Sequence, residues 1–253
     1  ADPSFDFALS PAPVLRAAAM PNEALDPVAL IAEMGRRARR AAAQISRLST
    51  SQKCHALIAA AASVRASVQD ILEANALDID DGRANGLSAA MLDRLALTPD
   101  RVAAIADGIE SVAQLRDPVG MVIDEVVRPN GLKLSRVRVP LGVVGIIYES
   151  RPNVTADAAA LCLKSGNAVI LRGGSEASRS NQAIHSALCK GLADTEISPE
   201  AIQLVPTKDR AVVGAMLAAH GLIDIIIPRG GKALVARVQD DARVPVLAHL
   251  DGI

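Results

Sequence analysis

The sequence has very few aromatic residues. Of its 253 residues one is Tyr, two are Phe and none is Trp, so aromatic side chains make up 1% of the chain. Base stacking, a common way of binding single-stranded nucleic acid, has almost no side chains to use. The net charge is −1, which lacks the basic excess typical of nucleic-acid-binding proteins. The composition therefore argues against a nucleic acid as partner.

Cysteine and long apolar runs are also scarce. The three cysteines, Cys54, Cys162 and Cys189, are too few and too scattered for a disulfide framework or a zinc site, so we expect no metal site. No apolar run reaches the roughly 20 residues that cross a bilayer. Residues 1–20 carry three prolines and no apolar core, which predicts a flexible leader rather than a secretory signal. We expect a cytoplasmic protein that does not associate with a membrane.

Half of the residues are hydrophobic, and their spacing in the first third predicts helices. Asp26-Pro27 places a capping residue before a proline at the first helical position and predicts a helix that ends near Ile45. Ser49 and Gln52 form a capping box, which predicts a second helix. Thr98-Pro99 repeats the first signal and is followed by apolar residues at helical spacing.

Residues 118–140 change to a strand-like pattern. Met121–Val127 and Leu132–Val139 are strand-like in composition, and Pro129–Gly131 between them is typical of a turn. The alternation of apolar residues slips within the second segment, which indicates a bulge. The segment is therefore predicted to be a hairpin that either lies at a sheet edge or projects as an arm.

From residue 141 onward short Val/Ile-rich runs alternate with helical patterns. The predicted strands are Val143–Ile147, Ala168–Leu171, Ala201–Val205, Ile223–Ile227 and Val244–Ala248. The predicted helices are Val154–Lys164, Ser178–Leu192, Asp209–Ala219 and Gly230–Val238. Almost continuous apolar strands are covered on both faces, so the pattern predicts an α/β fold with a doubly wound, Rossmann-like parallel sheet.

Four predicted strand exits carry residues that suit an anion. They are Tyr148–Asn153, Arg172–Glu176, Pro206–Lys208 and Pro228–Lys232. Ligands of open parallel sheets bind outside the carboxyl ends of the strands, where helix N-termini offer free amides. Glycines let the backbone approach a ligand, and arginine can bind phosphate with two hydrogen bonds. The sequence thus predicts a site for a phosphate-bearing ligand such as a dinucleotide.

Each of these signals also has a purely structural interpretation. The glycine pairs are common in tight turns, Arg172 could be a solvated loop residue, and Asn153 could cap the next helix. The G-x-G-x-x-G fingerprint and the P-loop pattern are both missing, which disfavours a classical dehydrogenase or an ATPase. No cysteine lies in a glycine-rich turn, and none is expected to be a nucleophile. His249 lies near Asp251, and their role stays open.

Residues 140–181 carry the motifs YESRPNV and LKSGNAVILRGGSEA. These motifs resemble the gamma-glutamyl phosphate reductase (glutamate-5-semialdehyde dehydrogenase) family, which belongs to the aldehyde dehydrogenase superfamily. Weaker similarity covers most of the remaining chain, including IDIIIPRGGKALV, and leaves out only the leader before about residue 21. The resemblance implies NADPH-dependent reduction of L-glutamyl 5-phosphate to L-glutamate 5-semialdehyde with release of phosphate, in proline biosynthesis. A cysteine thioester is the implied intermediate, and its oxyanion needs a hydrogen-bond donor.

The resemblance also implies roles for particular residues. Asn153 matches the asparagine that stabilises the oxyanion. Arg172 matches a basic residue near the adenosine ribose, which suits the 2′-phosphate of NADP, and Gly173 and Ser175 lie in the same loop. A second loop is expected beside the pyrophosphate and the nicotinamide ribose, and it consists of Pro228, Arg229, Gly230 and Gly231.

The implied domain organisation is a leader (1–20), an NADPH-binding domain (21–117 and 141–253) and an oligomerisation hairpin (118–140) that makes a homo-oligomer. Family members are longer, and their catalytic domain with the nucleophilic cysteine is expected after residue 253, so this chain alone is expected to be inactive. Two alternatives are open. The chain could be a cofactor-binding or oligomerisation module without catalysis, or it could come from an aldehyde dehydrogenase that acylates CoA.

Overall fold

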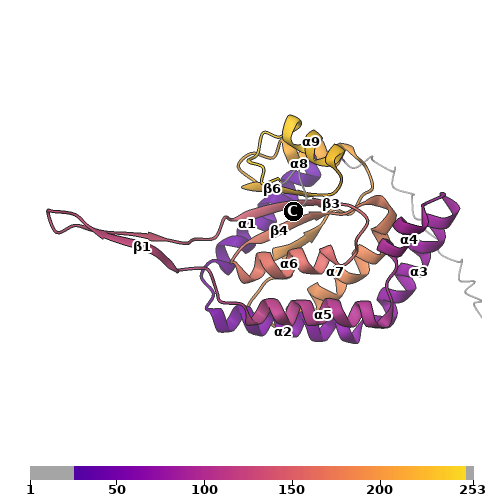
Figure 1. The fold of residues 1–253 in the computed structure, drawn as a ribbon, viewed down its shortest axis with the longest axis horizontal. Helices are drawn as coiled ribbons and strands as arrows, with labels where there is room; N and C mark the ends of the chain where they lie inside the picture. Colours follow the sequence, from indigo (N-terminus) through magenta and orange to yellow (C-terminus); the bar gives the residue numbers. More distant parts are fainter. Residues whose placement is uncertain (1–25, 249–253) are drawn as a thin grey trace, which may run out of the picture.

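The computed structural model describes residues 26–248. A parallel sheet is covered by helices on both faces, and a two-stranded hairpin projects from this body (Figure 1). The α/β fold predicted from the sequence is confirmed. The predicted leader at residues 1–20, together with His249 and Asp251, lies outside the described residues.

The first third contains the helices α1 (Pro27–Ile45), α2 (Thr50–Ala66), α3 (Val68–Ala84), α4 (Ala89–Leu95) and α5 (Pro99–Gln114). Three of them, α1, α2 and α5, begin directly after the predicted capping residues, whereas α3 and α4 were not predicted. Asp26 accepts a hydrogen bond from the amide of Val28, and Ser49 forms the complete capping box. Thr98 accepts from the amide of Arg101 at the start of α5. Within residues 26–248, no helix has the length and apolar character needed to cross a membrane.

The parallel sheet contains four strands in the order β5-β4-β3-β6. These strands are β3 (Val143–Tyr148), β4 (Ala168–Arg172), β5 (Ile202–Leu204) and β6 (Ile225–Arg229). The intervening helices are α6 (Val154–Lys164), η1 (Ser175–Ala177), α7 (Ser178–Leu192), η2 (Pro199–Ala201), α8 (Ala211–Leu217) and α9 (Lys232–Asp241). Every residue of β3 is buried, as its unbroken apolar sequence predicts.

The fifth predicted strand, Val244–Ala248, is wrong. This segment makes only an isolated bridge between Val246 and Ile226. The amide of Ile226 donates to Pro245 O, and the amide of Leu247 donates to Ile226 O. Proline has no amide hydrogen to extend the ladder, so the pairing ends after these two hydrogen bonds.

The helices form layers on the two faces of the sheet. Helices α1, α8 and α9 lie on one face, and α6 and α7 lie on the other, with α2 and α5 as an outer layer beyond them (Figure 1). Small residues let the outer layer approach closely, since a Cβ at Gly191 of α7 would lie 2.6 Å from Ala60 Cα of α2. Close helix packing on Ala and Gly explains how the chain builds a core with so few aromatic side chains.

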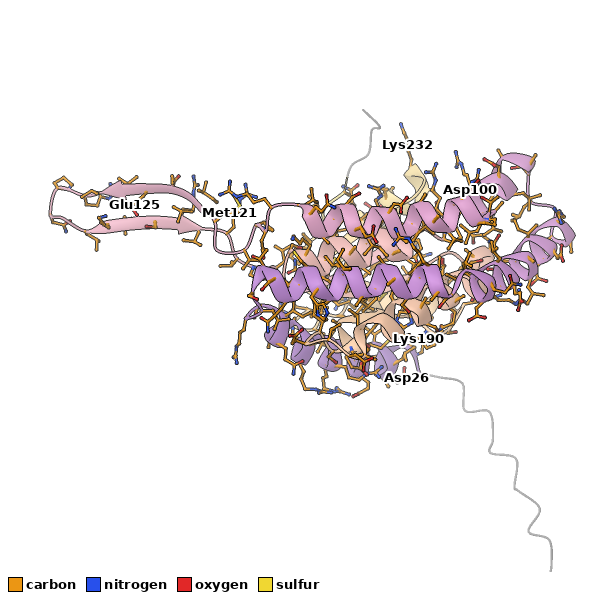
Figure 2. All side chains as sticks on the ribbon, turned by 90° about the horizontal axis from the view of Figure 1, so that it is seen from below. Asp26, Asp100, Met121, Glu125, Lys190 and Lys232 are labelled. Carbon is orange, nitrogen blue, oxygen red and sulfur yellow. The ribbon has the colours of Figure 1, made fainter. Side chains whose placement is uncertain are left out.

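The hairpin projects as an arm, which decides between the two arrangements left open by the sequence. Strands β1 (Val122–Val127) and β2 (Lys133–Val137) pair in antiparallel fashion, and all of their residues are exposed (Figures 1 and 2). The register shifts between Val122 and Asp124, which face Val137 and Arg136. The predicted irregularity therefore exists, but its extra residue is on the first strand rather than the second.

Candidate functional site

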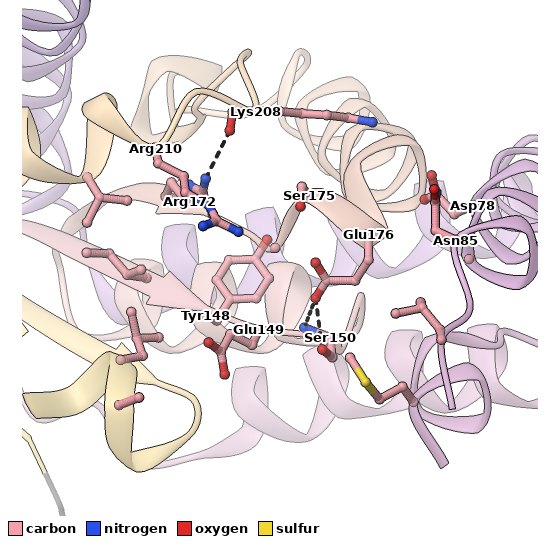
Figure 3. Close-up of a pocket in the computed structure, with 18 of the residues that line it drawn as sticks. Asp78, Asn85, Tyr148, Glu149, Ser150, Arg172, Ser175, Glu176, Lys208 and Arg210 are labelled. Carbon is pink, nitrogen blue, oxygen red and sulfur yellow. Dashed lines mark hydrogen bonds between the residues drawn. The ribbon is translucent and has the colours of Figure 1, made fainter. Parts of the chain in front are cut away.

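A hollow of about 870 Å³ lies at the carboxyl ends of the parallel strands (Figure 3). Tyr148 comes from the end of β3, Arg172 ends β4, and Lys208 and Arg210 follow β5. Residues of α3 and α4 line one side of the hollow, and residues of α9 line the opposite side. Its volume falls in the range of pockets that enclose a small molecule or a cofactor. We refer to it as the large hollow.

Arg172 brings an incompletely bonded guanidinium to the large hollow. Its Nη1 donates to Gly173 O at 3.0 Å and its Nη2 to Lys208 O at 3.4 Å (Figure 3). Its Nε is buried and has no acceptor within residues 26–248. Burial lowers the pKa of Arg172, Glu176 opposes this effect, and the like charge of Arg210 adds to it. A bound anion would satisfy the buried N–H and relieve the repulsion between the two guanidinium groups.

Gly173 is required by close packing rather than by a left-handed turn. A Cβ at this position would lie 2.2 Å from Asn181 Nδ2 and 3.0 Å from the hydroxyl oxygen of Tyr148. Its φ lies outside the left-handed region, as does that of Gly174. With Ser175, both glycines line a neighbouring hollow of about 470 Å³. The absence of a side chain lets the exit of β4 pass directly over these buried groups.

Two carboxylates hold the strand exits together. Glu176 Oε1 accepts hydrogen bonds from the amide and from the hydroxyl of Ser150, each at 2.8 Å (Figure 3). Ser150 has a φ of 51°, the one positive value among the non-glycine residues that the structure describes. Glu149 Oε2 accepts from the amide of Gly231 at 2.9 Å, and the amide of Glu149 donates to Arg229 O at 3.1 Å. The exits of β3, β4 and β6 are thus fixed relative to one another.

The predicted site residues fall into separate places. Arg172 and Ser175 line the large hollow, and Gly173 lines the neighbouring one. The second predicted loop consists of Pro228 and Arg229, the last two residues of β6, and of Gly230 and Gly231 after them. It lies beside Glu149 and lines neither hollow. The structure therefore brings the first loop directly to the large hollow and places the second loop next to it.

Asn153 lies in a third hollow of about 450 Å³, which none of the other predicted site residues lines. It precedes α6, but its side chain does not cap the helix, so the structural alternative offered by the sequence is wrong. Its Nδ2 instead donates to Asp157 Oδ2 at 2.8 Å. Burial raises the pKa of Asp157, while the hydrogen bond from Asn153 and the positive charge of Arg229 oppose that rise. Asp157 therefore fixes the orientation of the Asn153 amide.

The cysteines lie outside the large hollow and the Asn153 hollow. Burial raises the pKa of Cys162 to about 12 and that of Cys189 to about 11. Two cysteines lie beside a histidine: His55 follows Cys54 directly in the sequence, and Cys189 Sγ is 3.4 Å from His185 Nε2, one helical turn away in α7. Burial lowers the pKa of His185, which disfavours the imidazolium that would activate a thiol.

Several residues that contact one another at the candidate site have no role assigned by the sequence. Glu149, Glu176 and Lys208 all stand in the strand exits, so their position was visible but their partners were not. Arg210 follows two residues after Lys208. Asp157 stands one helical turn after Asn153, a spacing that could have suggested the hydrogen bond between them.

The fold and the strand-exit site together define the class of protein. Residues 24–252 match the aldehyde dehydrogenase family, and the chain belongs to that family. Among curated proteins it is similar to the gamma-glutamyl phosphate reductase of Novosphingobium aromaticivorans, with 66% identity over 224 residues that cover 88% of this chain and 53% of that protein. The corresponding protein of Sphingopyxis alaskensis is 67% identical over 235 residues, which cover 93% and 54%. The chain spans about half the length of the curated relatives it matches.

Solved structures agree with this relationship. The gamma-glutamyl phosphate reductase of Thermotoga maritima superposes with a TM-score of 0.84 at 42% identity, over 86% of this chain and 52% of that one. The Saccharomyces cerevisiae enzyme gives a TM-score of 0.81 at 33% identity, over 88% and 56%. An acetylating aldehyde dehydrogenase from Geobacillus thermoglucosidasius shares the fold, with a TM-score of 0.68 at 14% identity over 90% of this chain and 47% of that one.

Proposed function

We propose that this chain forms the NADPH-binding part of a cytoplasmic gamma-glutamyl phosphate reductase, which reduces L-glutamyl 5-phosphate to L-glutamate 5-semialdehyde and releases phosphate. One observation carries the proposal: the buried Arg172 Nε, without an acceptor in the described part of the chain, lies at the ends of parallel strands. The 66% identity to a protein of that name supports the choice of substrate. In this proposal residues 21–117 and 141–253 bind the cofactor.

The residues around the large hollow fit an anionic dinucleotide. Arg172, Lys208 and Arg210 would bind its phosphate groups, with Arg172 and the hydroxyl of Ser175 assigned to the 2′-phosphate. The segment at the end of β6 is assigned to the pyrophosphate and nicotinamide ribose, and it consists of Pro228, Arg229, Gly230 and Gly231. When bound, NADPH supplies the hydride for the reduction. The bonds that Glu149 and Glu176 accept would hold these loops in position before binding.

Asn153 is the proposed donor to the oxyanion. An amide nitrogen carries two hydrogens, and the hydrogen bond to Asp157 uses one of them, which leaves the other for a substrate oxygen. None of the three cysteines lies with Asn153 in its hollow. The expected thiolate nucleophile is therefore assigned to the catalytic domain of the family, and we expect no turnover from residues 1–253 alone.

The hairpin arm is the proposed contact with a second copy of the chain. Apolar side chains that are 42–60% exposed occupy both strands and the turn; they are Val122, Ile123, Val126, Val127, Leu132, Leu134 and Val137. An isolated two-stranded hairpin is marginally stable in water, so burial of these side chains against another subunit would stabilise it.

Calorimetric titration of the chain with NADPH, NADH and coenzyme A tests the proposed cofactor. We expect NADPH to bind at least about tenfold more tightly than NADH, because only NADPH offers the 2′-phosphate to Arg172. Binding of coenzyme A in preference to NADPH would instead indicate an enzyme that acylates CoA. A chain that forms oligomers but binds none of the three ligands would be a module without a cofactor, and the proposal would be rejected.

A further inference from the structure

The hollow that contains Asn153 is rich in arginine. It lies between α4, the first half of α5 and the start of α6, and it encloses about 450 Å³. Its charged lining residues are Asp93, Arg94, Arg101, Arg151 and Asp157. Three guanidinium groups against two carboxylates make this a positively charged hollow.

One of the three arginines already has its partners. Arg101 Nη2 donates to Asp93 Oδ1 at 2.9 Å, and its Nη1 donates to Asp93 O at 2.6 Å and to Ala96 O at 2.8 Å. These hydrogen bonds satisfy the last carbonyls of α4 and neutralise the Asp93 carboxylate. Arg101 and Asp93 therefore form a structural pair that closes one wall of the hollow.

The other two arginines have no such partners. Neither Arg94 nor Arg151 makes a side-chain hydrogen bond or ion pair among residues 26–248, and both are exposed. The remaining carboxylate, Asp157, accepts a hydrogen bond from Asn153 and forms no ion pair with either arginine. Two cations on one concave surface are therefore left without a paired anion among residues 26–248.

The hollow also adjoins the proposed reaction site. Asn153, the proposed oxyanion donor, lines it directly. The charge of Arg229 at the end of β6 acts on Asp157, so the loop assigned to the nicotinamide side lies close by. A substrate whose reacting carbonyl contacts Asn153 would therefore extend its remaining groups into this hollow.

We propose that Arg94 and Arg151 form an anion-binding subsite for the substrate, in which their guanidinium groups bind a carboxylate or a phosphate carried by the glutamyl compound. The identity of the substrate rests on the proposed function, whereas the anion-binding property rests only on the charges and shape of the hollow. Paired guanidinium hydrogen bonds to one anionic group would orient the substrate relative to Asn153.

Calorimetric titration of the chain with inorganic phosphate, L-glutamate and L-glutamine tests the subsite. The variants are Arg94→Gln and Arg151→Gln, and Arg47→Gln is the control because Arg47 is exposed and lines none of the hollows. We expect each subsite variant to weaken the binding of at least one probe about tenfold, the loss of roughly one charge-assisted hydrogen bond. The control should bind as the unaltered chain does.

The probe that responds identifies the anionic group. Arginine-dependent binding of phosphate assigns the subsite to the acyl phosphate, and arginine-dependent binding of both amino acids assigns it to the carboxylate next to the amino group. The subsite is rejected if no probe binds, or if both arginine variants bind like the control. NADPH titrated into the same samples separates the two proposals. If the unaltered chain does not bind NADPH, the proposed function is rejected, whereas the result for the anion-binding subsite is unaffected.

Discussion

Replacement of Arg172 by Gln should weaken NADPH binding much more than NADH binding. The substitution removes the charge and the buried guanidinium Nε, which has no acceptor in the described residues, and leaves a shorter polar side chain. It also removes the hydrogen bond to Gly173 O and the one to Lys208 O, of which the second joins the exits of β4 and β5. Two effects are therefore expected, one on the cofactor and one on the loops.

The expected size of each effect follows from these contacts. A hydrogen bond to a charged group contributes about 1.5–3 kcal/mol, so loss of one such bond to the 2′-phosphate should weaken NADPH binding roughly ten- to 160-fold. NADH lacks that phosphate, and its affinity should change less than about threefold. The bond to Gly173 O is 3.0 Å long and the one to Lys208 O is 3.4 Å, so their loss should cost only about 1 kcal/mol of stability.

Nicotinamide fluorescence is a suitable assay, because the chain contains no Trp whose emission would interfere. Titrations of the Arg172→Gln variant with NADPH and NADH would be compared with those of Arg40→Gln, a control on the exposed surface of α1. Thermal unfolding would show that both variants are folded. Unchanged NADPH affinity in a folded Arg172→Gln variant, or an equal loss for both cofactors, would refute the role assigned to this guanidinium.

Three further predictions concern stability and assembly. Gly173→Ala should destabilise the fold by about 1–3 kcal/mol, measured by denaturant unfolding, because its Cβ would lie 2.2 Å from Asn181 Nδ2; a stability equal to wild type would show that this packing is loose. Asp117→Asn should cost about 3 kcal/mol at pH 7, since the buried Lys53 ammonium, 2.5 Å from the carboxylate, loses its counter-charge. Burial opposes ionisation of Asp117, but hydrogen bonds led by that from Lys53 lower its pKa below the unfolded value. The difference in unfolding free energy between wild type and Asp117→Asn should therefore shrink as the pH falls below about 4. A difference that does not change with pH would contradict this linkage. Val126→Asp on the exposed arm should convert an oligomer to monomers in light scattering, and an unaltered oligomer would exclude that face of the arm as the contact.

Local signals predicted most of the helices and most of the strands, but not α3 and α4. Helices α6 and α7 have the bounds expected from the sequence, because their apolar spacing is interrupted by polar or glycine-containing turns. The break between α2 and α3 at Ser67 contains neither proline nor glycine, so no local signal marks it. The segment around Pro245 has a strand-like composition, and one missing amide hydrogen limits it to a bridge.

The candidate site was only partly predictable, because its contacts join distant parts of the chain. Arg172 and Ser175 could be selected from the strand exits alone. The roles of Glu149 and Glu176 depend on which strands are neighbours, and hydrophobic periodicity does not contain the sheet order. Asn153 lines a separate hollow because α4 and α5 pack beside the start of α6, and this packing was not predictable from the sequence either.

The sheet order also has a consequence during synthesis of the chain. The strand β6, which pairs with β3, is the last of the four described strands to leave the ribosome, so one edge of β3 has unpaired backbone groups until residues Ile225–Arg229 are made. Such an edge, formed here by an entirely apolar strand, is a template for pairing with other chains. Nascent chains stalled before Ile225 should therefore depend on chaperones far more than chains released after β6 has paired.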